Sequence, residues 1–449
     1  MSSKIDLSKA YEKPDKKWRA YLWSPDDPEE KAPCTISVVN GKPIKVECWK
    51  NIAAFGQLFS DLNFHNPVDC LHGQFEDGRD FSLFYLQLEN FRLGSGIPYV
   101  CLFGKFLVRG IHLLEKEKKI EALYIRQQYI DEWSNKTPID VKQSDDGTFG
   151  RLDIQVDVPE KTILFQSDEM EVFLGHEISY SLQKVNRMVL YPLPRLALVF
   201  SSPILLVKAL ELREAVKHLL KCFIGNECGI VETTVKTGDY QIQEIFTYEN
   251  KLKLNYNSFN DHNIFLNMEV VMSYSNSILD NWFRIFSENQ IAINEYYRIS
   301  GERTLVNQRE IFMNAIHGVE MFYKILEIKV KIDPKSTGGK KKGELWKKFE
   351  SMLVILNDII WEVIPDNEIF LKKVIETRNH FSHYNLKSRD NDPLIIPQRL
   401  LGVYSKRIEL ICSLCLLIQL GLPAEILKER FKKYLHFFVL KGENRYLKN

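Results

Sequence analysis

The sequence predicts an α+β protein, in which a β-rich N-terminal region precedes an all-α C-terminal helical bundle. Short β-branched segments separated by turn residues fill the first part of the chain, whereas apolar residues recur with helical spacing from about residue 275 onward. Apolar residues make up 45% of the 449 residues and charged residues 27%, which is typical of a globular protein. We therefore expect two regions, 1–274 and 275–449.

The clearest strand signal is a hairpin near the N-terminus. Asn40 and Gly41 separate the β-branched segments 34–39 and 43–49, and an Asn-Gly pair between such segments strongly indicates a hairpin. The acidic, proline-containing stretch 24–33 before it is predicted to be a loop. Further strands are expected over 82–88, 99–108, 151–158, 169–174, 195–200, 230–236 and 240–247. A helix beginning at Pro203 is embedded among them, over 203–224.

The C-terminal region is predicted to contain five or so helices joined by mostly short connections. Apolar residues recur at intervals of three and four, which places them on one side of each helix. The expected helices cover 307–327, 345–360, a segment opened by Pro365 and Asp366, 397–420 and 424–440.

The termini, the cysteines and the net charge restrict the class of protein. The N-terminus has no apolar segment typical of a secretory signal, and the longest apolar run, 408–422, is too short for a membrane helix, so we expect a soluble, cytoplasmic protein. Cys412 and Cys415 form the one CxxC pair; without a second ligand pair they are predicted to be buried thiols rather than a zinc site. The formal net charge of +1 means that any polyanion must bind to a local basic patch.

One stretch near the C-terminus combines residues suited to phosphodiester cleavage. Arg378 carries a permanent charge on a planar group that matches phosphate oxygens. Asn379 adds neutral donors and an acceptor, and His383 can exchange a proton near neutral pH. RNA supplies its own nucleophile, the 2′-hydroxyl, so these groups suffice for cleavage without a metal ion or another cofactor.

The spacing of these residues limits how they can meet. Asn379 and His383 are four residues apart and share one side of a helix. Arg378 and His383 are five apart, which separates them by about 140° around a straight helix. They converge if the helix ends near His383; otherwise two copies of the chain build the site together. We favour a two-fold homodimer with this segment at its interface.

Arg378, Asn379 and His383, on a late helix of a C-terminal bundle, resemble the RNxxxH motif of HEPN ribonucleases. The β-rich region that precedes the bundle is similar to that of ApeA-type anti-phage proteins, as is its opening, Trp18 to Asp27. The resemblance implies that the Arg and His are catalytic, that the site forms between two HEPN domains and that no metal takes part. It also implies an abortive-infection endoribonuclease that cuts host RNA, such as tRNA in the anticodon loop, in response to a phage component.

Several other residues are candidates for supporting roles. Glu320, on the helix that resembles the first HEPN helix, either orients Arg378 or a histidine or is a charge at the rim. His380 is an accessory group or a packed side chain, and Tyr384 can stack on an unpaired base. Lys340, Lys341 and Lys342 are expected to bind the RNA backbone, the alternative being a solvated loop.

Two further functions compete with the nuclease. In the first, the bundle is non-catalytic, binds RNA or protein, or only dimerises, and Arg378 and His383 merely satisfy carbonyl groups at a helix end. In the second, His380 and His383 hold a metal ion for a hydrolase, although no suitably spaced carboxylate other than Glu376 lies on that helix. The complete motif favours the nuclease over the binder.

Overall fold

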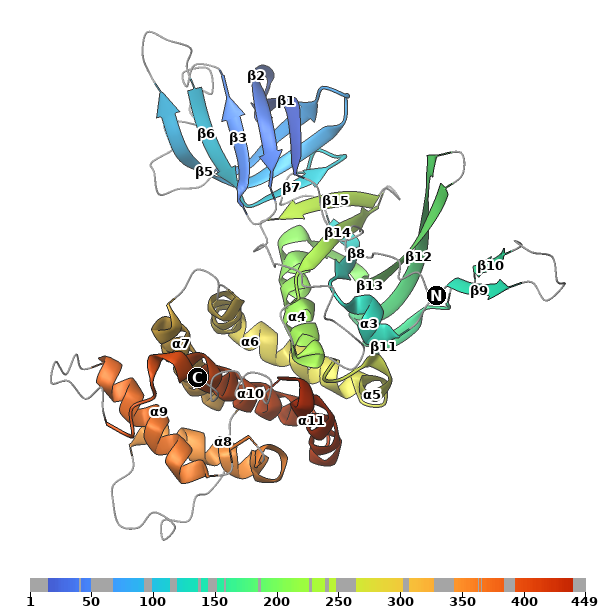
Figure 1. The fold of residues 1–449 in the computed structure, drawn as a ribbon. Helices are drawn as coiled ribbons and strands as arrows, with labels where there is room; N and C mark the ends of the chain where they lie inside the picture. The colour runs from blue at the N-terminus through green and yellow to red at the C-terminus, as the bar shows by residue number, and fades with distance from the viewer. Residues whose placement is uncertain are drawn as a thin grey trace. The chain divides into compact units, whose positions relative to one another are not determined.

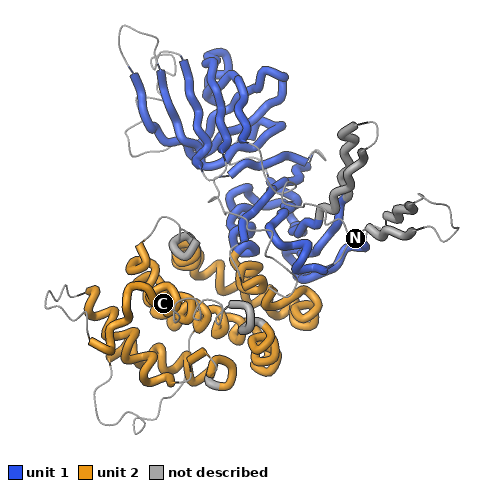
Figure 2. Tube along the Cα trace, viewed as in Figure 1, with its two compact units in different colours: residues 1–217, 228–259 blue, residues 218–227, 260–449 orange. Residues whose placement is uncertain are grey.

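A computed structural model gives the fold of the chain (Figure 1). It describes residues 15–39, 42–49, 68–92, 99–113, 119–135, 139–143, 152–156, 159–184, 187–225, 228–238, 242–247, 264–301, 307–326, 343–361, 363–364, 366–382 and 392–438. The chain divides into two compact units (Figure 2). The β unit comprises residues 1–217 and 228–259, and the helical unit comprises residues 218–227 and 260–449. The predicted α+β fold, strands first and helices second, is confirmed.

Six antiparallel strands of the β unit close into a barrel, in the order β5-β4-β1-β2-β3-β6 with β6 pairing back to β5. Their bounds are β1 Lys16–Ser24, β2 Asp27–Val38, β3 Ile44–Cys48, β4 Val68–Phe75, β5 Asp80–Arg92 and β6 Tyr99–Gly104. The predicted hairpin is present as β2 and β3, with Cys34 opposite Cys48. Asn40 and Gly41 themselves lie outside the described residues.

Side chains alternate between the interior and the exterior of this barrel. In β3, Ile44, Val46 and Cys48 are fully buried, whereas Lys45 and Glu47 point outward and form an ion pair of 3.0 Å. The same alternation along the other strands fills the interior with one apolar cluster, which includes Leu22, Ile36, Leu71, Phe81, Leu83, Leu86, Val100 and Leu102. Burial of this cluster provides the main driving force for closing the barrel.

Strand β5 also joins the barrel to a second, open sheet. Phe81 to Phe84 pair with β7, Phe106–Arg109, whereas Gln87 to Arg92 pair with β6. Tyr85 lies between these two segments with φ of 52°, a left-handed backbone conformation that is uncommon for a residue with a side chain. This single residue therefore marks the bend at which β5 changes partners.

The open sheet continues from β7 in the order β15-β14-β8-β13-β12-β11. Its strands are β8 Lys119–Gln127, β11 Thr162–Gln166, β12 Met170–Lys184, β13 Arg187–Leu205, β14 Ile230–Thr237 and β15 Ile242–Thr247. Between β8 and β11 the chain forms a short helix, α3 Ile130–Ser134, and a separate hairpin of β9 Ile139–Gln143 and β10 Leu152–Val156. Helix α4, Leu206–Ile224, follows β13, and its residues up to Lys217 belong to the β unit. Its buried Arg213 donates hydrogen bonds to the hydroxyl groups of Thr233 and Thr247, at 3.4 and 2.9 Å.

Two details of the predicted β region are wrong. The stretch 24–33 is not a loop throughout, because β2 begins at Asp27 and pairs with β1. Proline is tolerated at position 33 because its missing N–H falls where the β2–β3 ladder ends. Pro203 does not begin the helix, because β13 continues to Leu205 by pairing with β8.

The helical unit contains the last turns of α4 and the helices that follow. These are α5 Met268–Met272, α6 Ser275–Gly301, α7 Gln308–Ile325, α8 Glu344–Ile360, α9 Asn367–Ser382, a short 3-10 turn Gln398–Leu400, α10 Leu401–Gln419 and α11 Ala424–Phe438. Helix α7 packs against α6, α8 and α10, and α8 packs against α9, α10 and α11. The predicted helices are therefore present with boundaries shifted by a few residues. No helix within the described ranges is long and apolar enough to cross a membrane.

A glycine terminates helix α10. Gly421 adopts φ of 107° after α10, and the N–H groups of Gly421 and Leu422 bond to the carbonyls of Ile418 and Leu417, each at 3.0 Å. This Schellman arrangement satisfies the last carbonyls of the helix.

Cys412 and Cys415 lie in the buried core, as predicted, and burial raises the pKa of Cys415 to about 12, so the thiol is uncharged.

Candidate active site

Helix α9 carries the candidate site on its last two turns. The helix begins where the side chain of Asp366 accepts a hydrogen bond of 2.8 Å from the backbone N–H of Ile369. Its buried side consists of Phe370, Leu371, Val374 and Thr377, which recur with helical spacing. This buried side fixes the rotation of the helix and leaves Arg378, Asn379 and His380 half-buried near its C-terminal end.

Arg378 and Asn379 form a hydrogen-bonded pair. The Nη1 atom of Arg378 donates to Oδ1 of Asn379 at 3.3 Å. Among the described residues, neither of these two side chains forms another hydrogen bond. The pair therefore holds a permanent cation beside an amide group at a partly exposed surface, where both can reach a bound phosphate.

His380 lies next to this pair on the same helix. Its Nδ1 atom is buried and has no hydrogen-bond partner among the described residues, and its ring lies 5.7 Å from that of Phe381. In the ranges the structure describes, no group of three or more His, Cys, Asp or Glu residues is arranged to hold a metal ion. His380 thus has the contacts of a packed side chain, and its accessory role stays a prediction.

Glu320 lies on α7 and is half-buried. Among the described residues it forms no hydrogen bond or ion pair with Arg378 or His380, so the expected orienting role stays a prediction. His383, Tyr384 and the lysines at 340–342 lie outside the described residues. The last described residue of α9 is Ser382, which immediately precedes His383.

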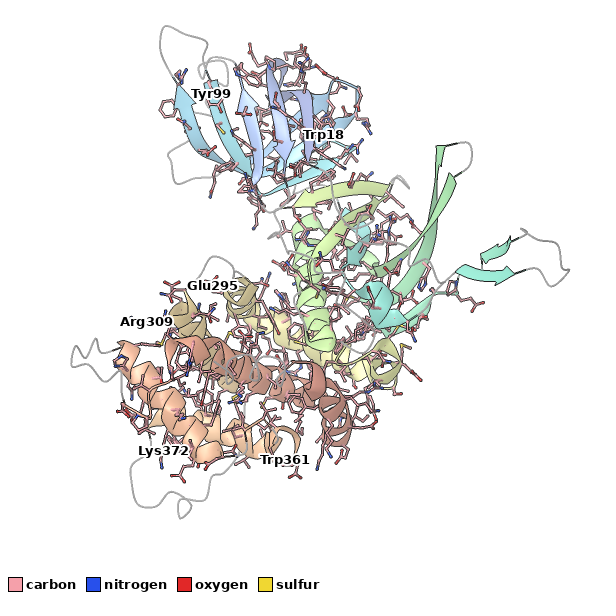
Figure 3. The ribbon with its side chains drawn as sticks, in the orientation of Figure 1. Trp18, Tyr99, Glu295, Arg309, Trp361 and Lys372 are labelled. Atoms are coloured by element: carbon pink, nitrogen blue, oxygen red, sulfur yellow. The ribbon has the colours of Figure 1, made fainter. Side chains whose placement is uncertain are left out.

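Two contacts that sequence reasoning missed hold the end of α9. Arg309, which Figure 3 labels at the start of α7, donates from Nη2 to the carbonyl oxygen of Phe381 at 2.6 Å. The fully buried Thr377 accepts a hydrogen bond of 2.9 Å from the backbone N–H of Ile396. The partners are separated by 72 and 19 residues, and no local sequence signal reveals contacts over such separations.

Comparison with known protein families gives two matches. Residues 17–289, more than half of the chain, match ApeA N-terminal domain 1. Residues 277–426 match the Apea-like HEPN domain, and this second match contains α7 to α10 and the Arg378–Asn379 pair. No curated protein and no solved structure shows significant similarity to the chain.

Proposed function

Because the chain belongs to the ApeA family and carries an ApeA-like HEPN domain, we propose that it is a metal-independent endoribonuclease of anti-phage defence. HEPN domains are typically ribonucleases. The observation that supports the proposal most directly is the hydrogen-bonded pair of Arg378 and Asn379 near the end of α9. These are two of the three polar positions of the motif, and His383 follows one residue after the described end of the helix.

The proposed reaction is a transfer of the phosphoryl group within the RNA. A histidine, His383, takes the proton of the 2′-hydroxyl, and the 2′ oxygen forms a bond to phosphorus. The bond from phosphorus to the 5′ oxygen of the next nucleotide breaks, and this oxygen takes up a proton from a protonated imidazole, that of His383 or of its copy in the second subunit. The products are a 2′,3′-cyclic phosphate and a 5′-hydroxyl end.

Arg378 stabilises the negative charge that develops on the phosphate oxygens. Its planar guanidinium matches two oxygens at once and never loses its proton. Asn379 limits the rotation of this side chain by accepting one of its N–H groups. Groups placed in advance where charge develops supply a large share of catalysis, because they need not reorganise during the reaction.

The proposed partners follow from the same chemistry. The substrate is host RNA, most simply tRNA, whose backbone would also contact Lys340, Lys341 and Lys342. A second copy of the chain completes a homodimer or larger homo-oligomer through the HEPN domain. The β unit would sense a phage component and release the nuclease.

The test is incubation of the full chain with total tRNA in EDTA, beside Arg378→Ala and His383→Ala, with and without phage lysate. We expect discrete fragments with cyclic phosphate ends from the wild type alone. Fragments from all three proteins would overturn the assignment of these residues, and activity that EDTA abolishes would favour a metal site. A mobility shift of tRNA with no product, even with lysate, would establish the non-catalytic binder instead.

A further inference from the structure

We propose that Arg309 is a positioning residue for the nuclease, which fixes the C-terminal end of α9 and thereby the place from which His383 follows. This inference rests on the proposed function. Arg309 belongs to another helix and lies 74 positions before His383 in the chain. Its side chain contacts the backbone and the ring of Phe381, two residues before that histidine.

The start of α7 holds Arg309 in place. Asn307 caps the helix, since its Oδ1 atom accepts a hydrogen bond of 3.1 Å from the backbone N–H of Arg309. The side chain then reaches across to α9, where Nη2 donates to the Phe381 carbonyl at 2.6 Å. The last four carbonyls of a helix lack partners within the helix, and a cation there also offsets the helix dipole. Arg309 therefore supplies both a donor and a charge to the end of α9.

Phe381 is held by its ring as well as by its carbonyl. The guanidinium carbon of Arg309 lies 4.6 Å from the centre of the Phe381 ring, within the range of a cation–π contact. The fully buried Phe312, one turn further along α7, meets the same ring edge-on at 6.1 Å. Rotation or fraying of the last turn of α9 would break all three contacts.

The chain is also held after the segment that contains His383. The backbone N–H of Ile396 donates to the buried Thr377 hydroxyl on α9, at 2.9 Å. The described structure thus anchors the chain to α9 beyond residues 383–391 and fixes Phe381 before them. Because a displacement of about 1 Å can cost a catalytic group about a hundredfold in rate, this anchoring is suited to placing a general base.

The test uses full-length Arg309→Met and Arg309→Lys, with Arg284→Met as a matched control on an exposed residue of α6. We expect Arg309→Met to lower kcat by about 10- to 100-fold with KM within about twofold, and Arg309→Lys to recover part of the loss because it keeps a donor. Arg284→Met should cleave like the wild type. An unchanged kcat in Arg309→Met, or a loss that a lowered melting temperature explains fully, would overturn the inference.

A second readout separates this inference from the proposed function. Hydrogen exchange of the backbone amides over 379–386, followed by mass spectrometry, needs no activity. Faster exchange there in Arg309→Met, but not in Arg284→Met, would support the positioning role. If the wild type cleaves no RNA, the proposed function fails, and this measurement still decides whether Arg309 holds the end of α9; unchanged exchange would show that it does not.

Discussion

At the scale of single residues, burial separates the polar side chains that hold the fold together from those that remain accessible to a substrate. Thr377 is fully buried, and its hydroxyl oxygen accepts a hydrogen bond from the backbone N–H of Ile396. Arg378, the next residue, is half-buried, and among the described residues its side chain forms a hydrogen bond only with that of Asn379. The helix makes this division, because adjacent residues point about 100° apart around its axis. Sequence reasoning could identify Arg378 and Asn379 by their chemistry but could not foresee Arg309, whose role depends on a distant carbonyl.

One partly buried carboxyl group, that of Asp131, predicts how stability depends on pH. Burial, helped by the neighbouring charge of Glu132, raises the pKa of Asp131 from 3.8 to about 7. The folded chain therefore binds this proton more tightly than the unfolded chain, so the contribution of Asp131 to stability is fully present below about pH 4 and is lost as the pH rises towards 7.

We expect Asp131→Asn to remove this dependence, because an amide does not ionise. Its melting temperature should exceed that of the wild type at pH 8 and approach it near pH 4. Asp26→Asn, in an exposed turn, is the matched control and should follow the wild type at both pH values. If the difference between Asp131→Asn and the wild type does not grow with pH, the raised pKa is wrong.

At the scale of elements, local patterns predicted the helices better than the strands. The helix expected over 345–360 is found at Glu344–Ile360, because its apolar spacing is recorded within the segment itself. Strands β1, β4, β8, β9 and β11 were missed, since each depends on partners that the sequence does not identify. Closure of the barrel was not predictable either, because it requires β5 to bend at Tyr85 and pair with both β4 and β6.

The packing of α7 on α6 gives a prediction with an unusual sign. In a helix interior, Gly→Ala normally stabilises by about 1 kcal/mol. A Cβ atom at Gly318 would overlap the ring of Tyr296, which packs edge-on against the buried Phe322 at 5.1 Å. We therefore expect Gly318→Ala to destabilise the helical unit by about 1–3 kcal/mol instead.

The measurement is thermal or urea unfolding, followed by circular dichroism. Gly402→Ala on α10 is the control, because the added Cβ would meet only the Oε1 end of Gln308, at 2.7 Å, and this flexible side chain can move away. A Gly318→Ala variant as stable as Gly402→Ala would mean that α6 and α7 do not approach each other closely at this point.

At the scale of the whole molecule, the two compact units do not follow the chain as two successive regions, because each unit is made of two separate stretches of sequence. Residues 218–227 group with the helices, although strands of the β unit follow them in the chain. Composition and hydrophobic spacing predicted strands first and helices second, but a segment that leaves one unit and returns to it produces no local signal. Whether the active site belongs to one chain or to two is a question at this same scale.

Mixing two inactive variants shows whether the active site is built by one chain or by two. Because we favour a two-fold homodimer with this segment at its interface, we expect each site to take Arg378 from one subunit and His383 from its partner. Arg378→Ala and His383→Ala, mixed in equal amounts and allowed to exchange subunits, should then regain about a quarter of wild-type cleavage, because half of the dimers are mixed and each has one intact site of two.

If both residues of a site come from one chain, no mixed dimer contains an intact site, and the mixture must stay as inactive as its components. Exchange is verified independently by capturing one tagged variant with the other. Recovery in the mixture, with each variant inactive alone, would establish that dimerisation assembles the catalytic groups, and the anchoring of α9 by Arg309 would then act across the dimer on a site that neither chain completes by itself.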